Sequence, residues 1–250
     1  MIRRSWFALA LLGLAACSDA TADPTTAVSD NVTASTAGAV TRRTFTTADG
    51  TVIDYVLLVP EGRATGEPGK VLFAFPPGGQ DIDLAERIVT ERYRSAALDR
   101  DYVVVSPAAP STGLFFTDAS AALVPELLDA VATEFPPEDG RFDLMGVSNG
   151  GLSAFAAAIA TPERFRSLVV FPGNSPDGGD DPALENLGGL GVAMFVGAED
   201  TGWLDAARAT EQTLDDLGIT VELTEVPGEG HIIESLTGDD LFAAVERVRT

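Results

Sequence analysis

Residues 141–160 read Arg-Phe-Asp-Leu-Met-Gly-Val-Ser-Asn-Gly-Gly-Leu-Ser-Ala-Phe-Ala-Ala-Ala-Ile-Ala, and no other segment says as much about the fold. Its first part, 141–147, is a short and mostly apolar run that predicts a buried strand, and 150–160 is a small-residue run that predicts a helix. Ser148 lies between them, with a glycine two positions away on either side. Glycine leaves room for a tight turn where a Cβ would strike the neighbouring backbone. The stretch therefore predicts a sharp strand-to-helix turn with Ser148 at its apex.

Strand and helix patterns alternate on both sides of this turn. Two β-rich runs, 42–47 and 51–60, flank an Ala-Asp-Gly turn and predict an antiparallel hairpin. Short apolar runs predict strands over 70–76, 102–106, 141–147, 167–171, 190–196 and 220–226, and helices are predicted over 81–98, 119–135, 150–160, 205–217 and 239–248. Apolar strands that alternate with helices predict an α/β fold, with a mostly parallel sheet covered on both faces. We expect eight strands in one domain over 41–250, with Ser148 after the fifth.

The segment Gly146-Val147-Ser148-Asn149-Gly150 is a Gly-x-Ser-x-Gly motif in this strand–turn–helix context. It resembles the nucleophile elbow of the α/β-hydrolase superfamily. The resemblance covers about residues 41–250 and implies the α/β-hydrolase fold, an eight-stranded sheet whose second strand is antiparallel. It also implies that Ser148 is the nucleophile of a serine hydrolase that needs no cofactor and no metal. The alternative is a glycine-rich turn with an incidental serine.

A serine hydroxyl becomes a good nucleophile only when a neighbouring base takes its proton. His231 is the only histidine of the chain, and it follows the last predicted strand, where α/β-hydrolases carry their catalytic histidine. The resemblance places the acid in the turn after the 190–196 strand, which assigns Asp200 and gives the chain order Ser, Asp, His. Glu199 is the rival acid. A histidine with a purely structural role is the alternative for His231.

Backbone N–H groups are expected to stabilise the oxyanion of acyl transfer. One is the amide of Asn149, the residue after the nucleophile. The second comes from the loop after the third predicted strand, 75–80, where relatives often carry His-Gly and this chain has two prolines. Proline has no N–H, so the donor is Gly79 first, then Gly78, with Gln80 also open. A turn without a catalytic role is the alternative.

Aromatic residues follow two of the predicted strands at the same sheet edge. Phe115, Phe116 and Trp203 are predicted to line a substrate pocket, although aromatic residues in such loops are equally often packing residues. The segment 172–189, where many relatives insert a lid, is short and polar, which predicts an open cleft without a large lid. The Gly-Val-Ser-Asn-Gly-Gly elbow resembles the esterase branch that includes polyhydroxybutyrate depolymerases and feruloyl esterases.

The amino terminus has the pattern of a bacterial lipoprotein signal. A basic start precedes an apolar run, 6–16, which is too short to span a bilayer and ends in Leu-Ala-Ala before Cys17. This resembles a lipobox and implies a signal peptide over 1–16 and a lipidated Cys17 that begins a flexible tether over 17–40. The expected location is the cell envelope, lipid-anchored to the outer membrane on its periplasmic or surface side. An ordinary secretory signal is the alternative.

The composition excludes several functions. The chain has 250 residues with 16 Lys+Arg against 38 Asp+Glu, a net charge of −22. Such a chain repels phosphate backbones and anionic lipid, so we expect no nucleic-acid partner and membrane contact only through the anchor. A single cysteine excludes an internal disulfide, and a single histidine excludes multi-histidine metal sites. The same charge disfavours anionic substrates, and we expect a monomer that acts on small-molecule or polymer-end esters.

Two alternatives to a serine esterase stay open at this point. Prolyl-oligopeptidase relatives share the elbow motif, which makes a serine peptidase one alternative, but they usually add a large cap or propeller that this length cannot hold. The other alternative is a non-catalytic surface lipoprotein that uses a hydrolase scaffold as a binding module. The presence of Ser148, Asp200 and His231 in the family order favours an enzyme.

Overall fold

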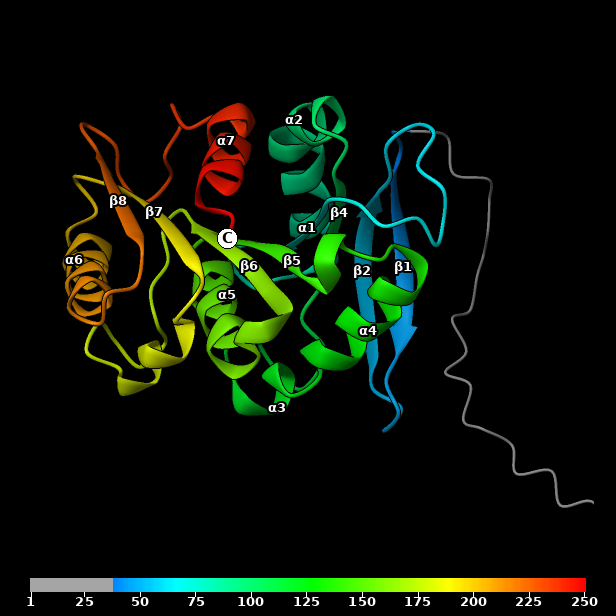
Figure 1. The fold of residues 1–250 in the computed structure, drawn as a ribbon, viewed down its shortest axis with the longest axis horizontal. Helices are drawn as coiled ribbons and strands as arrows, with labels where there is room; N and C mark the ends of the chain where they lie inside the picture. Colours follow the sequence, from blue (N-terminus) through cyan, green and yellow to red (C-terminus); the bar gives the residue numbers. More distant parts are fainter. Residues whose placement is uncertain (1–37) are drawn as a thin grey trace, which may run out of the picture.

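The computed structural model describes residues 38–250, in which an eight-stranded sheet runs through the molecule (Figure 1). Its strands are β1 (Val40–Thr46), β2 (Val52–Leu58), β3 (Val71–Phe75), β4 (Val103–Pro107), β5 (Phe142–Gly146), β6 (Phe165–Val170), β7 (Gly191–Gly197) and β8 (Val221–Val226). The predicted signal peptide, Cys17 and most of the predicted tether lie outside the described residues. Across 38–250, every helix falls short of the length and apolar character that a bilayer span requires.

The strands follow the order β1-β2-β4-β3-β5-β6-β7-β8. β2 pairs antiparallel with both β1 and β4, and the remaining neighbours pair in parallel. The predicted hairpin, the mostly parallel sheet and the antiparallel second strand are all confirmed. The position of Ser148 after the fifth strand is confirmed as well, and the carboxyl ends of β5, β7 and β8 all lead into loops that carry predicted site residues.

Helices cover both faces of the sheet. They are α1 (Ile82–Ile88), α2 (Arg94–Asp99), α3 (Asp118–Ala121), α4 (Val124–Glu134), α5 (Asn149–Ala160), α6 (Thr201–Asp216) and α7 (Gly238–Val248), with short turns η1 (Val89–Tyr93), η2 (Glu138–Gly140), η3 (Pro162–Arg164) and η4 (Pro182–Leu187). Figure 1 shows α1, α2 and α7 on one side of the sheet and α3 to α6 on the other. Each face packs its own cluster of buried apolar side chains. The strands are therefore buried on both faces, as their nearly continuous apolar runs predict.

Two predicted helices are interrupted. The predicted helix over 119–135 is split into α3 and α4, because Pro125 occupies the first turn of α4. Proline lacks an N–H and clashes with the preceding turn, so a helix can begin at it but does not continue through it. The predicted helix over 81–98 contains the π-helical turn η1 between α1 and α2. This turn holds one more residue than regular α-helix and keeps both Val89 and Tyr93 buried.

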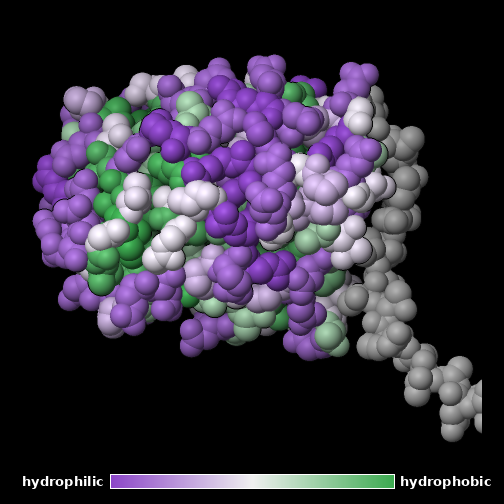
Figure 2. All heavy atoms as spheres, in the orientation of Figure 1, coloured by the Kyte–Doolittle hydropathy of each residue, from purple (hydrophilic) through white to green (hydrophobic). Residues whose placement is uncertain are grey.

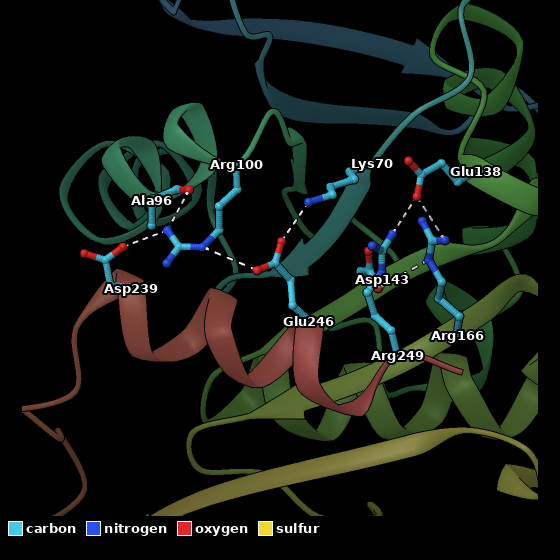
Figure 3. A network of polar contacts seen from close by, with 9 residues as sticks. All are labelled: Lys70, Ala96, Arg100, Glu138, Asp143, Arg166, Asp239, Glu246 and Arg249. Carbon is cyan, nitrogen blue, oxygen red and sulfur yellow. Dashed lines mark hydrogen bonds and ion pairs between the residues drawn. The ribbon is translucent and has the colours of Figure 1, made fainter.

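Charged residues at the amino ends of the strands form a network with the carboxyl-terminal helix (Figure 3). Lys70, just before β3, pairs with Glu246 of α7 at 2.7 Å. Arg249, which follows α7, donates to Asp143 of β5 at 3.2 Å and to Glu138 at 3.0 Å. These contacts join the last helix to the strands through charged groups that neutralise one another.

Asp143 is the centre of this network. Its side chain is fully buried and accepts a hydrogen bond from Ser167 at 2.7 Å. Burial raises its pKa, and the Ser167 hydroxyl and the guanidinium groups of Arg249 and Arg166 oppose that shift. Arg166 is itself buried and lies 3.5 Å from Asp143. A buried carboxylate of this kind depends on its partners, because an uncompensated buried charge is strongly destabilising.

The surface is largely hydrophilic, as the net charge of −22 predicts. Figure 2 shows hydrophilic residues over most of one face, with a hydrophobic area toward the side where β7 lies. Scattered apolar surface of this extent is ordinary for a folded protein.

Candidate active site

Ser148 sits on a strained turn between β5 and α5. Its φ of 56° and ψ of −121° lie in a region that residues with a side chain rarely adopt. Its N–H donates to the carbonyl of Pro172 at 2.9 Å. A Cβ on Gly150 would lie 2.2 Å from the carbonyl oxygen of Phe75, so only glycine lets α5 approach β3 this closely. The predicted sharp turn is confirmed, and it holds Ser148 above the carboxyl end of the sheet.

His231 connects Ser148 with Asp200. Its Nε2 lies 2.8 Å from Ser148 Oγ, and its Nδ1 lies 2.7 Å from Asp200 Oδ2. The Asp200 side chain is 17% exposed and that of His231 43% exposed, so solvent and ligands reach the imidazole. Trp203, in the first turn of α6, packs beside the imidazole with ring centroids 5.4 Å apart. The rival acid Glu199 is exposed, and its side chain has no polar partner within residues 38–250.

Glu229 organises the loop that carries His231. Its carboxylate accepts hydrogen bonds from the N–H groups of Glu234 at 3.1 Å and Ser235 at 3.0 Å, and its own carbonyl accepts from Glu199 N–H at 2.9 Å. The hydrogen bonds from Ser235, and then that from Glu234, hold the pKa of Glu229 below its usual value. An ionised carboxylate thus holds together, through these hydrogen bonds, the loop that carries His231.

Gln80 fixes the loop after β3. It is buried, and its side chain donates to Ser153 Oγ at 2.8 Å and accepts from Phe115 N–H at 3.0 Å. Its own N–H donates to the Pro77 carbonyl at 3.0 Å, which closes a turn. Gln80 is therefore not an oxyanion donor, because its N–H already has an acceptor.

Gly78 and Gly79 remain as donors from this loop, beside Asn149 at the start of α5. None of their three N–H groups has an acceptor among residues 38–250. The Gly78 carbonyl accepts a hydrogen bond from Asn149 Nδ2 at 2.8 Å. In a trans peptide the carbonyl and the following N–H point in opposite directions, so the N–H of Gly79 points away from that Asn149 side chain. Only Gly78 of the two lines the cavity beside Ser148, which favours it as the candidate second donor, and the order of the two glycines stays a prediction.

A cavity of about 460 Å³ opens beside Ser148 and His231. Two segments form its walls: α1 with η1 on one side, and the loop after His231 on the other. Its apolar lining consists of Leu84, Ile88, Val147, Phe171, Ile232 and Ile233, and its charged lining of Arg87, Glu91 and Arg92. The Gly78 backbone lines the same cavity. A cavity of this size and character fits a small molecule of mixed polarity.

The predicted aromatic lining is wrong for Phe115. It is 1% exposed, and its ring packs in the core 5.2 Å from that of Phe75. Gln80 explains the inward position, because it binds the Phe115 backbone from inside the fold. Phe116 is half-buried and does not line the cavity. Trp203 is also absent from the cavity lining, although it does lie at the site through its contact with His231.

The segment 172–189 carries no large lid, as predicted. It contains only the short turn η4, and Leu184 and Leu187 of that turn are buried in the core. Asp181 is buried too, where it accepts hydrogen bonds from the Ser175 hydroxyl and the Ala183 N–H. The segment is thus folded against the protein, and the cavity stays open beside it.

Neither a protein-family model nor a curated protein matches this chain. Among solved structures, it matches an S-formylglutathione hydrolase from Agrobacterium tumefaciens at 20% identity and a TM-score of 0.67, covering 86% of this chain and 98% of that one. It matches a thermostable esterase at 18% identity and a TM-score of 0.62, over 83% of this chain, and spans 59% of that longer protein. A ferulic acid esterase matches at 15% identity and a TM-score of 0.62, covering 84% and 97%. Together with the sheet order, these matches show that the chain has the α/β-hydrolase fold.

Proposed function

We propose that this chain is a serine hydrolase that cleaves carboxylic esters, with Ser148, His231 and Asp200 as its catalytic residues. The observation that carries the proposal is the unbroken line of contacts from Ser148 Oγ through the imidazole to the Asp200 carboxylate, at 2.8 and 2.7 Å. A base in hydrogen-bond reach of a hydroxyl, oriented by a carboxylate, is the arrangement that activates serine. Esterases among the structural neighbours support esters as the substrate class.

The proposed reaction has two halves. In the first, Ser148 Oγ attacks the ester carbonyl while His231 Nε2 takes its proton, and Asp200 stabilises the imidazolium. The N–H groups of Asn149 and Gly78 stabilise the oxyanion. The intermediate collapses, the alcohol leaves with the proton from His231, and the acyl group stays on Ser148. In the second half, His231 Nε2 takes a proton from water while the water oxygen attacks the acyl carbonyl. The bond to Ser148 Oγ then breaks, His231 returns the proton to Oγ, and the acid is released.

A fluorophosphonate probe tests the nucleophile directly, because it reacts only with an activated serine. We expect the wild type to be labelled and Ser148→Ala to be unlabelled. Ser111→Ala, which removes an exposed serine in another loop, is the control and should be labelled like the wild type. An unlabelled wild type would contradict the proposal and favour a non-catalytic binding module on the same fold.

A substrate panel tests the reaction class. The elbow resembles those of polyhydroxybutyrate depolymerases and feruloyl esterases, so the panel holds p-nitrophenyl acetate and butyrate, hydroxybutyrate oligomers and feruloyl esters. Aminoacyl-p-nitroanilides are included beside them to detect peptidase activity. We expect hydrolysis of the esters and none of the anilides, and the reverse outcome would make the protein a serine peptidase.

We also propose that the chain is anchored to the cell envelope through Cys17. The support is the sequence alone: a basic start, an apolar run and Leu-Ala-Ala before the cysteine. In a bacterial host fed an alkyne-tagged palmitate, the full chain should incorporate the label and fractionate with membranes. Cys17→Ser should abolish the label, and an unlabelled, freely released wild-type chain would indicate an ordinary secretory signal.

A further inference from the structure

The cavity beside Ser148 departs from the acidic character of the chain. Its charged lining consists of Arg87, Glu91 and Arg92, two cations and one anion, which leaves one net positive charge. The chain as a whole carries −22. Long-range repulsion of anions is screened over about 8–10 Å at physiological salt, so inside the cavity these nearby groups decide which ligands are favoured.

Arg92 is already engaged within the protein. Its guanidinium donates to the carbonyl of Leu236 and, at 3.5 Å, to that of Ile233. Both acceptors belong to the loop that follows His231. Arg92 therefore ties this loop to η1 and forms part of the cavity wall.

Arg87 has no such partner. It is exposed at the carboxyl end of α1, and its side chain makes no hydrogen bond or ion pair within residues 38–250. Glu91, four residues further on, lines the same cavity without an ion pair to it. Every other lysine and arginine in the described part of the chain has a protein acceptor. In a chain with 38 acidic residues, an unpaired guanidinium in the cavity that Ser148 lines is the exception that points to a ligand.

The rest of the lining defines what that ligand must look like. Apolar side chains line the same cavity as Ser148 and the charged residues, among them Ile88, Phe171 and Ile232, of which Ile232 is 71% exposed. A ligand that satisfies both kinds of surface combines an ester and apolar carbon groups with one negative group. One net positive charge suits a monoanion better than a dianionic phosphate, and guanidinium binds a carboxylate through paired hydrogen bonds.

We propose that Arg87 binds a free carboxylate carried by the ester substrate, so that the enzyme prefers esters of dicarboxylic or hydroxycarboxylic acids over neutral esters of equal length. This inference rests on the proposed ester hydrolysis at Ser148 and names its substrate class. It also limits the expectation from net charge, because the acidic surface acts at long range whereas Arg87 acts by contact.

Matched pairs of esters test the proposal on both sides of the scissile bond. On the acyl side, mono-p-nitrophenyl adipate is compared with its methyl ester. On the alcohol side, ω-acetoxyhexanoate is compared with its methyl ester. The proteins are the wild type, Arg87→Gln, Arg87→Lys and the control Arg208→Gln, which removes another exposed charge outside the cavity.

We expect the wild type to prefer the charged member of at least one pair. Arg87→Gln should lower kcat/KM for that ester by about tenfold to hundredfold and change kcat/KM for its neutral partner less than about twofold. Arg87→Lys should keep part of the preference, Arg208→Gln all of it, and added salt should reduce it.

Other outcomes overturn the proposal in distinguishable ways. Equal rates on charged and neutral esters, or a preference that survives in Arg87→Gln, would show that Arg87 binds no carboxylate while ester hydrolysis itself stands. No hydrolysis of any ester, with no fluorophosphonate labelling, would remove both this inference and the proposed function.

Discussion

Polar side chains at the two ends of the parallel sheet differ in how fully they are buried and paired within the protein. At the amino end, Lys70, Asp143 and Arg249 are paired with other protein groups, and Asp143 is fully buried among them (Figure 3). At the carboxyl end, His231 is 43% exposed, and Arg87 has no partner within residues 38–250. The first end satisfies its charges internally. The second keeps them available to a ligand.

This difference indicates that residues at one end of the sheet contribute mainly to stability and residues at the other end mainly to turnover. The positive φ of Ser148 stores backbone strain that the surrounding fold has to offset. The network around Asp143 ties the last helix to the strands at the far end. Substitutions at the two ends should therefore separate cleanly, one set affecting turnover and the other the free energy of unfolding.

Asp200→Asn should give the largest effect. The variant keeps the side-chain shape but no longer holds His231 in the tautomer that accepts the Ser148 proton, so kcat should fall by about 10⁴-fold. The free energy of unfolding, measured by urea titration, should change by less than about 1 kcal/mol. Near-normal turnover of p-nitrophenyl acetate would remove Asp200 from the mechanism.

Asp143→Ala should produce the opposite pattern. It leaves the buried Arg166 short of a partner and removes the acceptor of the Ser167 hydroxyl, so the free energy of unfolding should fall by about 3–5 kcal/mol. The kcat/KM of the folded variant should stay within about twofold of the wild type.

Two further variants calibrate this result. Asp143→Asn keeps the side-chain shape and should cost less than Asp143→Ala. Asp129→Ala removes an exposed ion pair with Arg164 and should cost at most about 1 kcal/mol. Equal costs for Asp143→Ala and Asp129→Ala would show that the amino-end network adds nothing beyond surface pairing.

Gly150→Ala should affect both turnover and the free energy of unfolding, because Gly150 packs against β3 and lies two residues from Ser148. Its Cβ would meet the Phe75 carbonyl at 2.2 Å, so α5 has to shift, at a cost of about 1–3 kcal/mol. A displacement of Ser148 by about 1 Å would lower kcat by about 10²-fold. Gly202→Ala in α6, with open space around it, should leave stability equal or raise it by up to about 1 kcal/mol. Unchanged unfolding and turnover in Gly150→Ala would contradict the close approach.

Glu229→Gln should give the smallest effect. We expect it to make the loop that carries His231 less ordered, with little change elsewhere. The pKa of Glu229 is lowered in the folded state. The stabilisation of the loop by its ionised carboxylate is therefore fully present above the ordinary pKa of 4.5 and is lost as pH falls through the lowered pKa of the folded state. Amide hydrogen exchange at Glu234 and Ser235 should be faster in the variant near neutral pH. Variant and wild type should converge only when the pH falls below the lowered pKa of Glu229, and identical exchange at pH 7 would show that the carboxylate does not order the loop.

Most of the fold could be predicted from the sequence, because buried parallel strands have continuous apolar runs and glycines flank the turn around Ser148. The interrupted helices were less readable. Pro125 did carry a signal for the break between α3 and α4, but the π-helical turn of η1 has no comparable marker. β6 begins at Phe165, two residues earlier than predicted, since the buried Arg166 breaks the apolar pattern.

Ser148, Asp200 and His231 could be predicted as site residues because each is either rare in the chain or part of a recognisable motif. Gln80, Arg92 and Glu229 were missed as loop-holding residues, because each has backbone partners distant along the chain or in a loop, whose positions only the folded chain defines. Phe115 was misplaced for the same reason. An aromatic residue after a strand has the same sequence signature whether its ring faces a ligand or the core.

The π-helical turn η1 supplies Glu91 and Arg92 to the wall of the cavity. Its additional residue lets Arg92 reach the Leu236 carbonyl while α2 continues beyond it. Deleting one residue between Val89 and Tyr93 would turn η1 into regular α-helix and change where Arg92 lies relative to the Leu236 carbonyl. A change in the length of η1 would therefore alter the cavity wall without replacing Ser148, Asp200 or His231.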